Sequence, residues 1–198
     1  MSVRQPMWWI CILYRAYLLK YLVQYCYICI KTTLMITITS EERASIEKII
    51  GECKECFVGM IDPEGLPYVI PMNFGYDNDT IYLHSAPEGT SVTALKTNPN
   101  VCITFCTKTN VVHQNEEVAC SYRIQGSSVI CRGKVTFIEN DKEKIEALNI
   151  LMKQYTDKPF NYSEPSVSHV MVWKVEIEQA SSKVFGIPYK QKHLHATK

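Results

Sequence analysis

Neither a charge excess nor a biased composition marks this 198-residue chain. Lys and Arg number 21 against 20 Asp and Glu, so the formal charge is +1 and no nucleic-acid partner is expected. Eight glycines and nine prolines are too few for a collagen-like or low-complexity protein. With 46% hydrophobic and 21% charged residues, the composition is typical of a globular protein, and the length suits one ordinary domain or two small ones.

The common catalytic signatures are also missing. The sequence contains no G-x-G-x-x-G after a strand, no G-x-x-x-x-G-K-[ST], no H-E-x-x-H and no G-x-S-x-G. These motifs carry phosphate cradles, zinc ligands and nucleophilic serines in the common nucleotide-binding, protease and hydrolase classes. Any chemistry must therefore be sought outside those classes.

Acidic residues are absent from the first 35 residues, which do contain four cations. Residues 7–30 are mostly apolar and aromatic and about long enough to span a bilayer. Charged residues interrupt this run, at a cost of about 3 kcal/mol for a cation near the centre of a lone spanning helix. No small-x-small cleavage site follows, which argues against a secretory signal. Residues 1–34 are thus a leader outside the native protein, an anchoring or interfacial helix, or a helix packed on the domain. Only the second alternative predicts a membrane partner.

Nine cysteines form no obvious scaffold. Two C-x-x-C pairs, Cys26 with Cys29 and Cys53 with Cys56, have zinc-ligand spacing, but no glycine-rich knuckle surrounds them, so we expect no metal. The odd total without a credible export signal favours reduced thiols in the cytoplasm.

From residue 35 onward, turn residues punctuate short apolar stretches. A first helix is predicted over 41–52 with Ser40 as its cap, and two more over 89–98 and 141–155. Six strands are predicted over 56–61, 67–74, 80–85, 101–107, 128–138 and 170–179. Strands at hairpin spacing with few helices indicate a mainly β fold with peripheral helices, closed as an antiparallel barrel. We expect a domain over 35–186 and a flexible tail over 187–198.

One dense polar stretch, residues 84–91, joins the end of a predicted strand to the start of a helix. Unpaired N–H groups at a helix N-terminus, a flexible Gly89 and nearby hydroxyls can bind a phosphate. The alternative is a capped helix whose hydroxyls bond only to their own backbone.

Several ordered motifs resemble one family. They are P-Y-V-I-P-M-N-F-G-Y-D at 67–77, I-Y-L-H-S-A-P-E-G at 81–89, N-P-N-V-C at 98–102, C-S-Y-R at 120–123, S-S-V-I-C-R-G-K-V-T-F-I-E at 127–139 and V-W-K-V-E at 172–176. The chain resembles the split-barrel flavoproteins related to pyridoxamine 5′-phosphate oxidase, and most of all the nitroimidazole-resistance proteins. This resemblance implies a six-stranded antiparallel split β-barrel and a homodimer with FMN between the subunits.

The resemblance also implies site residues. Ile70, Pro71, Met72 and Asn73 would lie along the flavin ring and ribityl chain. Ser85, Ala86 and Gly89 would approach the ribityl and phosphate end, and Ser128 would contact the flavin from the barrel. His84 matches a histidine implicated in activity in the nitroimidazole-resistance proteins.

The chain departs from many relatives after Gly89. Where those relatives carry two basic residues that pair with the phosphate, this chain has Thr90 and Ser91, which donate hydrogen bonds without charge. Because charge-assisted hydrogen bonds are roughly twice as strong as neutral ones, we expect weaker FMN binding unless another cation reaches the phosphate. Arg123 is the candidate substitute.

The leading functional hypothesis is an FMN-dependent oxidoreductase that reduces small oxidised molecules, with nitroaromatic compounds as a candidate class. NAD(P)H or a redox protein would supply electrons, and His84 would donate a proton or, alternatively, only bond to backbone at its strand end. A non-catalytic flavin-binding or haem-handling protein is a second hypothesis. Pyridoxamine 5′-phosphate oxidase activity is the weakest, because the basic pair is absent.

Overall fold

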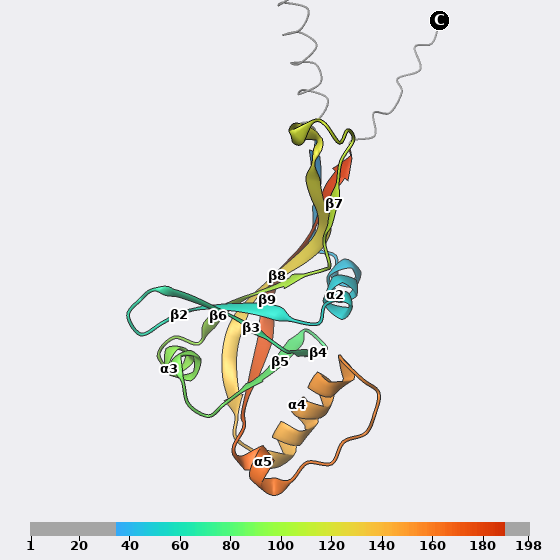
Figure 1. Ribbon diagram of the computed structural model, residues 1–198. Helices are drawn as coiled ribbons and strands as arrows, with labels where there is room; N and C mark the ends of the chain where they lie inside the picture. Colours follow the sequence, from blue (N-terminus) through green and yellow to red (C-terminus); the bar gives the residue numbers. More distant parts are fainter. Residues whose placement is uncertain (1–34, 189–198) are drawn as a thin grey trace, which may run out of the picture.

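The computed structural model describes residues 35–188, and the interpretations of 1–34 lie outside this range. Within it, strands dominate and every strand pairing is antiparallel (Figure 1). The elements are β1 (Met35–Ser40), α2 (Arg43–Glu52), β2 (Cys56–Ile61), β3 (Pro67–Met72), β4 (Gly75–Asp77), β5 (Thr80–Ser85), α3 (Thr90–Thr97), β6 (Asn100–Cys106), β7 (Asn110–Val112), a 3₁₀ turn (Ala119–Ser121), β8 (Arg123–Ile138), α4 (Asp141–Lys153), α5 (Glu164–Ser168) and β9 (Met171–Pro188).

The sheet curls back on itself. Its strands follow the order β3-β2-β6-β8-β9-β5-β4, so β3 and β4 form the two ends of the path. Only Asn73 and Phe74 separate these two strands in the chain, and two residues span less than about 11 Å even when extended. Seven strands spaced about 4.8 Å apart cannot lie flat under that constraint. This curvature is what a split barrel requires, and the mainly β prediction is confirmed.

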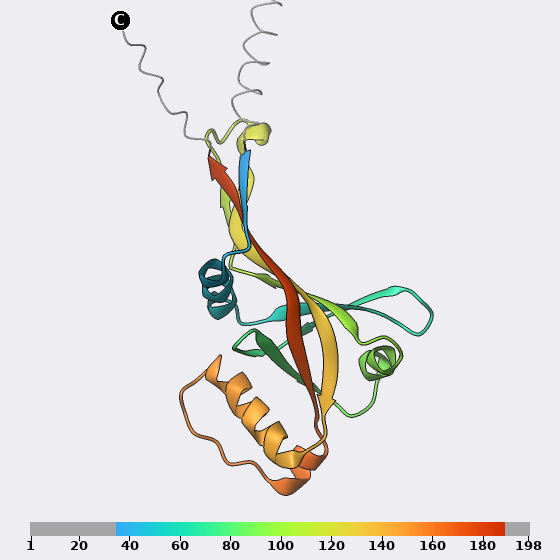
Figure 2. The ribbon, with the colours of Figure 1, turned by 180° about the vertical axis from the view of Figure 1, so that it is seen from behind.

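The interior of the curled sheet holds the main core. Its largest fully buried side chains include Trp173, Phe74 and Phe105, and the last two rings meet edge to face with centroids 4.7 Å apart. Alternate residues of β8 from Val129 to Val135 point inward and are buried, whereas their neighbours point to the outer face. The lower part of that outer face is covered by α4, which packs beside Val172 (Figure 2).

Close backbone approach fixes α4 against the sheet. A Cβ on Gly75 would lie 2.5 Å from the Leu151 Cα, so only glycine fits this contact. The backbone N–H of Phe74 donates to the Tyr155 hydroxyl at 2.9 Å, and that hydroxyl donates to the carbonyl of Lys54 at 2.9 Å. The chain just after α4 is thereby joined to the start of β2 and the end of β3, and β3 carries three of the predicted site residues, Ile70, Pro71 and Met72.

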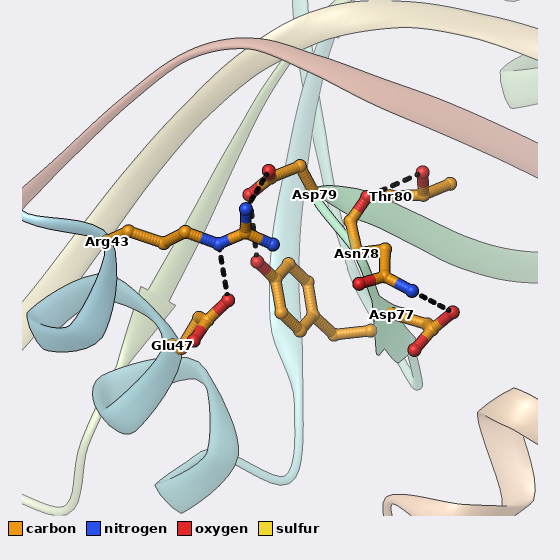
Figure 3. Close-up of polar contacts among 7 residues, drawn as sticks. Arg43, Glu47, Asp77, Asn78, Asp79 and Thr80 are labelled. Carbon is orange, nitrogen blue, oxygen red and sulfur yellow. Dashed lines mark hydrogen bonds and ion pairs between the residues drawn. The ribbon is translucent and has the colours of Figure 1, made fainter.

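A tight turn between β4 and β5 meets α2 (Figure 3). Asn78 and Asp79 have φ of 45° and 58°, the pattern of a two-residue type I′ hairpin turn. The Arg43 guanidinium lies 3.1 Å from an Asp79 carboxylate oxygen and 2.7 Å from one of Glu47. Since these side chains are about half exposed, the ion pairs contribute at most about 1 kcal/mol.

Six predicted strands are present, but several boundaries were wrong. The strand predicted over 128–138 starts at Arg123, and the one predicted over 170–179 runs from Met171 to Pro188, because each pairs with the other along its length. Ser40 does not cap α2: it still pairs in β1, its hydroxyl accepts from the Glu42 N–H at 3.0 Å, and the helix begins at Arg43. Strands β1, β4 and β7 and helix α5 were not predicted. No helix among residues 35–188 is long and apolar enough to cross a bilayer.

Candidate functional site

The N-terminus of α3 is open. Gly89 occupies the N-cap position with φ of 134°, a conformation that favours glycine, and no side chain caps the helix. A Cβ placed on Gly89 would meet nothing within 4 Å. The backbone N–H groups of Thr90, Ser91 and Val92 precede the first helical hydrogen bond, which Thr93 makes to the Gly89 carbonyl. Three N–H donors and two hydroxyls at the positive end of a helix form a donor set that fits a phosphate.

Strand β5 leads directly into this loop. Ser85, its last residue, accepts a hydrogen bond from the Trp173 indole N–H at 3.2 Å and donates to the Ala86 carbonyl at 2.7 Å. Trp173 is fully buried, so a core side chain sets the position of Ser85. Trp173 therefore belongs to the main core and not to the surface of the loop.

His84 pairs with Val172 and points to the outer face, where its side chain is exposed. Partial desolvation lowers the pKa of His84 from its ordinary value of 6.5. No hydrogen bond of its ring to another residue of 35–188 contributes to this pKa.

Strand β3 is an edge strand, with β2 as its partner and no second strand beyond it in the described sheet. On an edge strand, alternate residues direct their backbone N–H and C=O groups away from the ladder. Pro71 fits the outward set, because proline has no N–H to donate. Asn73 has the same parity, so the outward-directed backbone groups of this segment belong to Pro71 and Asn73, whereas Ile70 and Met72 face β2.

The end of β3 approaches His84 through β4. Gly75 pairs with Tyr82 at the end of the β4–β5 ladder. Asn73 precedes Gly75 by two residues, and His84 follows Tyr82 by two. Both residues therefore lie beyond the same end of this ladder. The predicted site segments 70–73 and 84–91 thus approach each other in space at this end.

Ser128 lies elsewhere. It pairs with Cys106 of β6 and Lys183 of β9, and Ile138 ten residues further along β8 is at the level of Val172 and His84. At about 3.3 Å per residue, Ser128 is about 33 Å from that level along the strand. Ser128 does face the same outer side of the sheet as Pro71. Cross-strand pairing places Pro71, Phe57, Thr104 and Ile130 in one row on that side, and Ser128 is two residues before Ile130 on β8.

A shallow hollow of about 790 Å³ opens on this outer face of β8 and β9, lined in part by Ile130, Arg132 and Lys183. None of the predicted site residues lines it. The hollow is thus not the predicted flavin site within one chain.

Arg123 does not approach α3 within one chain. It begins β8, fifteen residues before Ile138, and its Nε donates to the Gly186 carbonyl at 3.0 Å. A second bond, from NH1 to the Ser121 carbonyl, measures 3.5 Å. The guanidinium is therefore engaged with backbone at the start of β8, well away from α3 (Figure 1).

The C-x-x-C pair at Cys53 and Cys56 consists of neutral buried thiols. Desolvation raises the pKa of Cys53 to about 11 and that of Cys56 to about 12. Both thiols donate to backbone carbonyls, of Ile49 and Met72 respectively. Metal ligation requires thiolates, which this environment disfavours. Cys26 and Cys29 lie outside the described residues.

Comparison with known families matches residues 42–184 to the family described as pyridoxamine 5′-phosphate oxidase. The chain belongs to this family. The match spans α2 to most of β9 and includes all twelve predicted site residues. No match was found among curated proteins.

Solved structures agree with this assignment. A "putative 5-nitroimidazole antibiotic resistance protein" from Bacteroides thetaiotaomicron is 52% identical, with 76% of this chain and 89% of that chain covered and a TM-score of 0.70. The flavocytochrome Anf3 from Azotobacter vinelandii is 21% identical (78% and 72% covered, TM-score 0.66). The FAD and heme binding protein from Mycobacterium smegmatis is 17% identical (77% and 76% covered, TM-score 0.67). At these low identities, the last two structures show only that they share the fold of this chain.

Sequence reasoning missed the side chains that hold the site in place. The contact of Trp173 with Ser85 joins residues 88 positions apart, and the contact of Tyr155 with Phe74 joins residues 81 apart. No local sequence pattern predicts contacts between residues so far apart in the chain. A register prediction for β5 against β9 would have been the one available signal.

Proposed function

We propose that the protein is an FMN-dependent oxidoreductase that reduces small oxidised molecules, with nitroaromatic compounds such as 5-nitroimidazoles as its substrate class. The observation that carries this proposal is the 52% identity over 89% of the length of a protein described as a nitroimidazole resistance protein. The open helix N-terminus of α3 supports the cofactor part.

In this proposal the chain holds the FMN phosphate at the N-terminus of α3. Thr90 and Ser91 donate through backbone N–H groups and hydroxyls. The segment Ile70–Asn73 lies along the ring and ribityl chain and offers the outward-directed backbone groups of Pro71 and Asn73 to the ring edge, while Ser85 and Ala86 lie between the ring and the phosphate. Bound FMN would supply the hydride- or electron-transfer chemistry. Without a basic pair after Gly89, the affinity is lower than in relatives that have one.

A homodimer completes the site in this proposal. The outer face of β2 and β3 exposes Phe57 at 42%, Ile61 at 40% and Val69 at 61%. A contiguous apolar face of this kind marks an interaction surface. Burying it against a second copy would bring Ser128 of the partner subunit toward β3 of the first, so the flavin lies between subunits.

His84 is the proposed proton donor. Converting a nitro group to a nitroso group takes two electrons and two protons and releases one oxygen as water. A nicotinamide is the proposed donor, whose hydride accounts for both electrons and one of the two protons, and the protonated imidazole of His84 supplies the other proton to the substrate oxygen. The free thiols of the described cysteines suit the reducing cytoplasm in which we place this reaction.

The test begins with the visible spectrum of the purified protein. A yellow flavin spectrum, followed by NAD(P)H-dependent loss of a 5-nitroimidazole under anaerobic conditions, supports the proposal. Inactivity with every acceptor, despite bound flavin, contradicts the enzymatic part. A haem Soret band without flavin would select the haem-handling alternative instead.

A further inference from the structure

A side-chain hydroxyl joins β2 and β3 just beyond the end of their ladder. The last pair of that ladder is Cys56 with Met72, and the same register continued by two residues sets Lys54 opposite Phe74. At this position the Phe74 N–H donates to the Tyr155 hydroxyl at 2.9 Å, and the hydroxyl donates to the Lys54 carbonyl at 2.9 Å. The Tyr155 hydroxyl therefore takes the place of one hydrogen bond of the ladder.

This hydroxyl bridge is longer than a direct backbone hydrogen bond. A direct bond separates N and O by about 2.9 Å, whereas two such bonds that meet at one oxygen separate them by roughly 4.5–5 Å. The end of β3 is thus held at a fixed but greater distance from β2. Two residues after Asn73 the chain enters β4, where Gly75 pairs with Tyr82 of β5. The bridge lies where the chain leaves β2 for β5.

The bridge also sets the direction of the Asn73 carbonyl. The peptide bond between Asn73 and Phe74 is trans and planar, so its C=O and N–H point in opposite directions. Because the Phe74 N–H is directed at Tyr155, the Asn73 carbonyl is directed away from it. Phe74 is fully buried, and its ring meets that of Phe105 edge to face, so this peptide has little freedom to turn.

Tyr155 is itself held in place by reciprocal contacts between residues 53–54 and 154–155. The Lys54 ammonium lies 5.9 Å from the centre of the Tyr155 ring and donates to the Gln154 carbonyl at 3.0 Å. The Gln154 amide donates to the Cys53 carbonyl at 2.8 Å. A hydroxyl supported in this way is preorganised to hold the end of β3.

We propose that Tyr155 is a positioning residue of the flavin site, whose hydroxyl aims the backbone of Asn73 at the flavin ring edge. This inference rests on the proposed function, in which Asn73 offers backbone groups to that edge. Tyr155 acts through the peptide unit of residues 73–74 and not by contact with the cofactor. Since hydrogen bonds to the ring tune the electronics of a flavin, Tyr155 influences both its affinity and its spectrum.

Tyr155→Phe tests the proposal, because it removes the bridging hydroxyl and keeps the ring. The Phe74 N–H then loses its acceptor and turns toward another one, and the Asn73 carbonyl turns with it. We expect the dissociation constants of FMN and of riboflavin both to rise about tenfold, since the two ligands share the ring. Their ratio should stay as in the wild type, which separates this effect from one at the phosphate. The visible absorption of the bound flavin should also shift.

Two controls separate positioning from a general loosening of this region. Tyr162→Phe removes a hydroxyl that donates to the Asn149 side chain of α4 at 3.1 Å, and it should leave both dissociation constants unchanged. Gln154→Ala removes the bond to the Cys53 carbonyl and keeps the bridge, so both constants should change less than about twofold. All variants are compared at a temperature at which circular dichroism shows them to be folded.

Amide hydrogen exchange of the flavin-free protein reports on the bridge itself. The Phe74 amide should exchange faster in Tyr155→Phe than in the wild type, because its hydrogen bond is gone. Faster exchange together with wild-type flavin affinities and spectrum would overturn the inference and leave the proposed function standing. Equal weakening of flavin binding by Gln154→Ala would also overturn it, since stability alone would then explain the effect. A wild-type protein that binds no flavin would contradict the proposed function itself.

Discussion

Trp173 donates its indole N–H to the Ser85 hydroxyl across the β5–β9 ladder, at 3.2 Å. The indole is fully buried, whereas Ser85 lies where the strand leaves the sheet toward α3. This bond ties the proposed phosphate-binding loop to the core. The position of the loop is therefore set by a residue that does not belong to it.

A double-mutant cycle measures that bond. Ser85→Ala should lower the free energy of unfolding by about 1 kcal/mol, and Trp173→Phe by about 2 kcal/mol because it also shrinks a buried ring. The double variant should recover about 1 kcal/mol relative to the sum, read from urea unfolding followed by circular dichroism. Strictly additive effects would show that the bond contributes nothing to stability.

Gly75 offers a second test, of the contact between β4 and α4. Gly75→Ala places a Cβ 2.5 Å from the Leu151 Cα and should lower the free energy of unfolding by about 3 kcal/mol. Gly51→Ala is the control, since a Cβ there meets nothing within 4 Å, and a helical alanine should add about 0.5 kcal/mol. Similar melting temperatures for both variants would contradict the close packing.

The pKa of His84 predicts a pH dependence. Burial lowers this pKa below 6.5 in the folded protein, so the neutral ring is favoured relative to the unfolded chain. Its stabilising contribution is present above pH 6.5 and is lost as the pH falls through 6.5 toward the lowered pKa. Proton NMR of the imidazole should show a midpoint below 6.5, and His84→Gln should flatten this part of the stability profile. A midpoint at or above 6.5 would contradict the desolvated environment.

The Arg123→Ala variant tests whether Arg123 has a structural role or binds the cofactor. Its guanidinium bonds to the carbonyls of Gly186 and Ser121, so Arg123→Ala should loosen the segment where β7 and β9 pair with the start of β8 and increase amide exchange around β7. We expect the FMN dissociation constant to change less than about twofold, because the guanidinium is engaged far from α3. A tenfold weaker affinity would instead place this residue at the phosphate of a partner's site.

Sequence reasoning recovered the elements whose causes are local. Turn residues bounded β2, β3 and β5, and the helix predicted from residue 141 does begin there as α4, with Asn140 accepting from the N–H groups of Lys142 and Glu143. Strand β1 was missed because it depends on its register with β9 and follows an apolar run that masks its start. The lengths of β8 and β9 were underestimated for the same reason: their outer halves are stabilised by pairing with each other.

The candidate site was predictable as a set of segments but not as an arrangement. Residues 84–91 were identified from a strand end, a glycine and hydroxyls, all of which are local. The separation of Ser128 from His84 along β8 depends on strand register, which composition does not reveal. The partners of Arg123 are backbone carbonyls, and no sequence motif encodes them.

The central claim is that the open N-terminus of α3 binds the phosphate of a flavin. Fluorescence titrations with FMN and with riboflavin, which lacks the phosphate, test it directly. We expect FMN to bind at least about tenfold more tightly, Ser91→Lys to increase that preference and Ser91→Glu to abolish it. Equal affinities for FMN and riboflavin in the wild type, unchanged in both variants, would contradict the account.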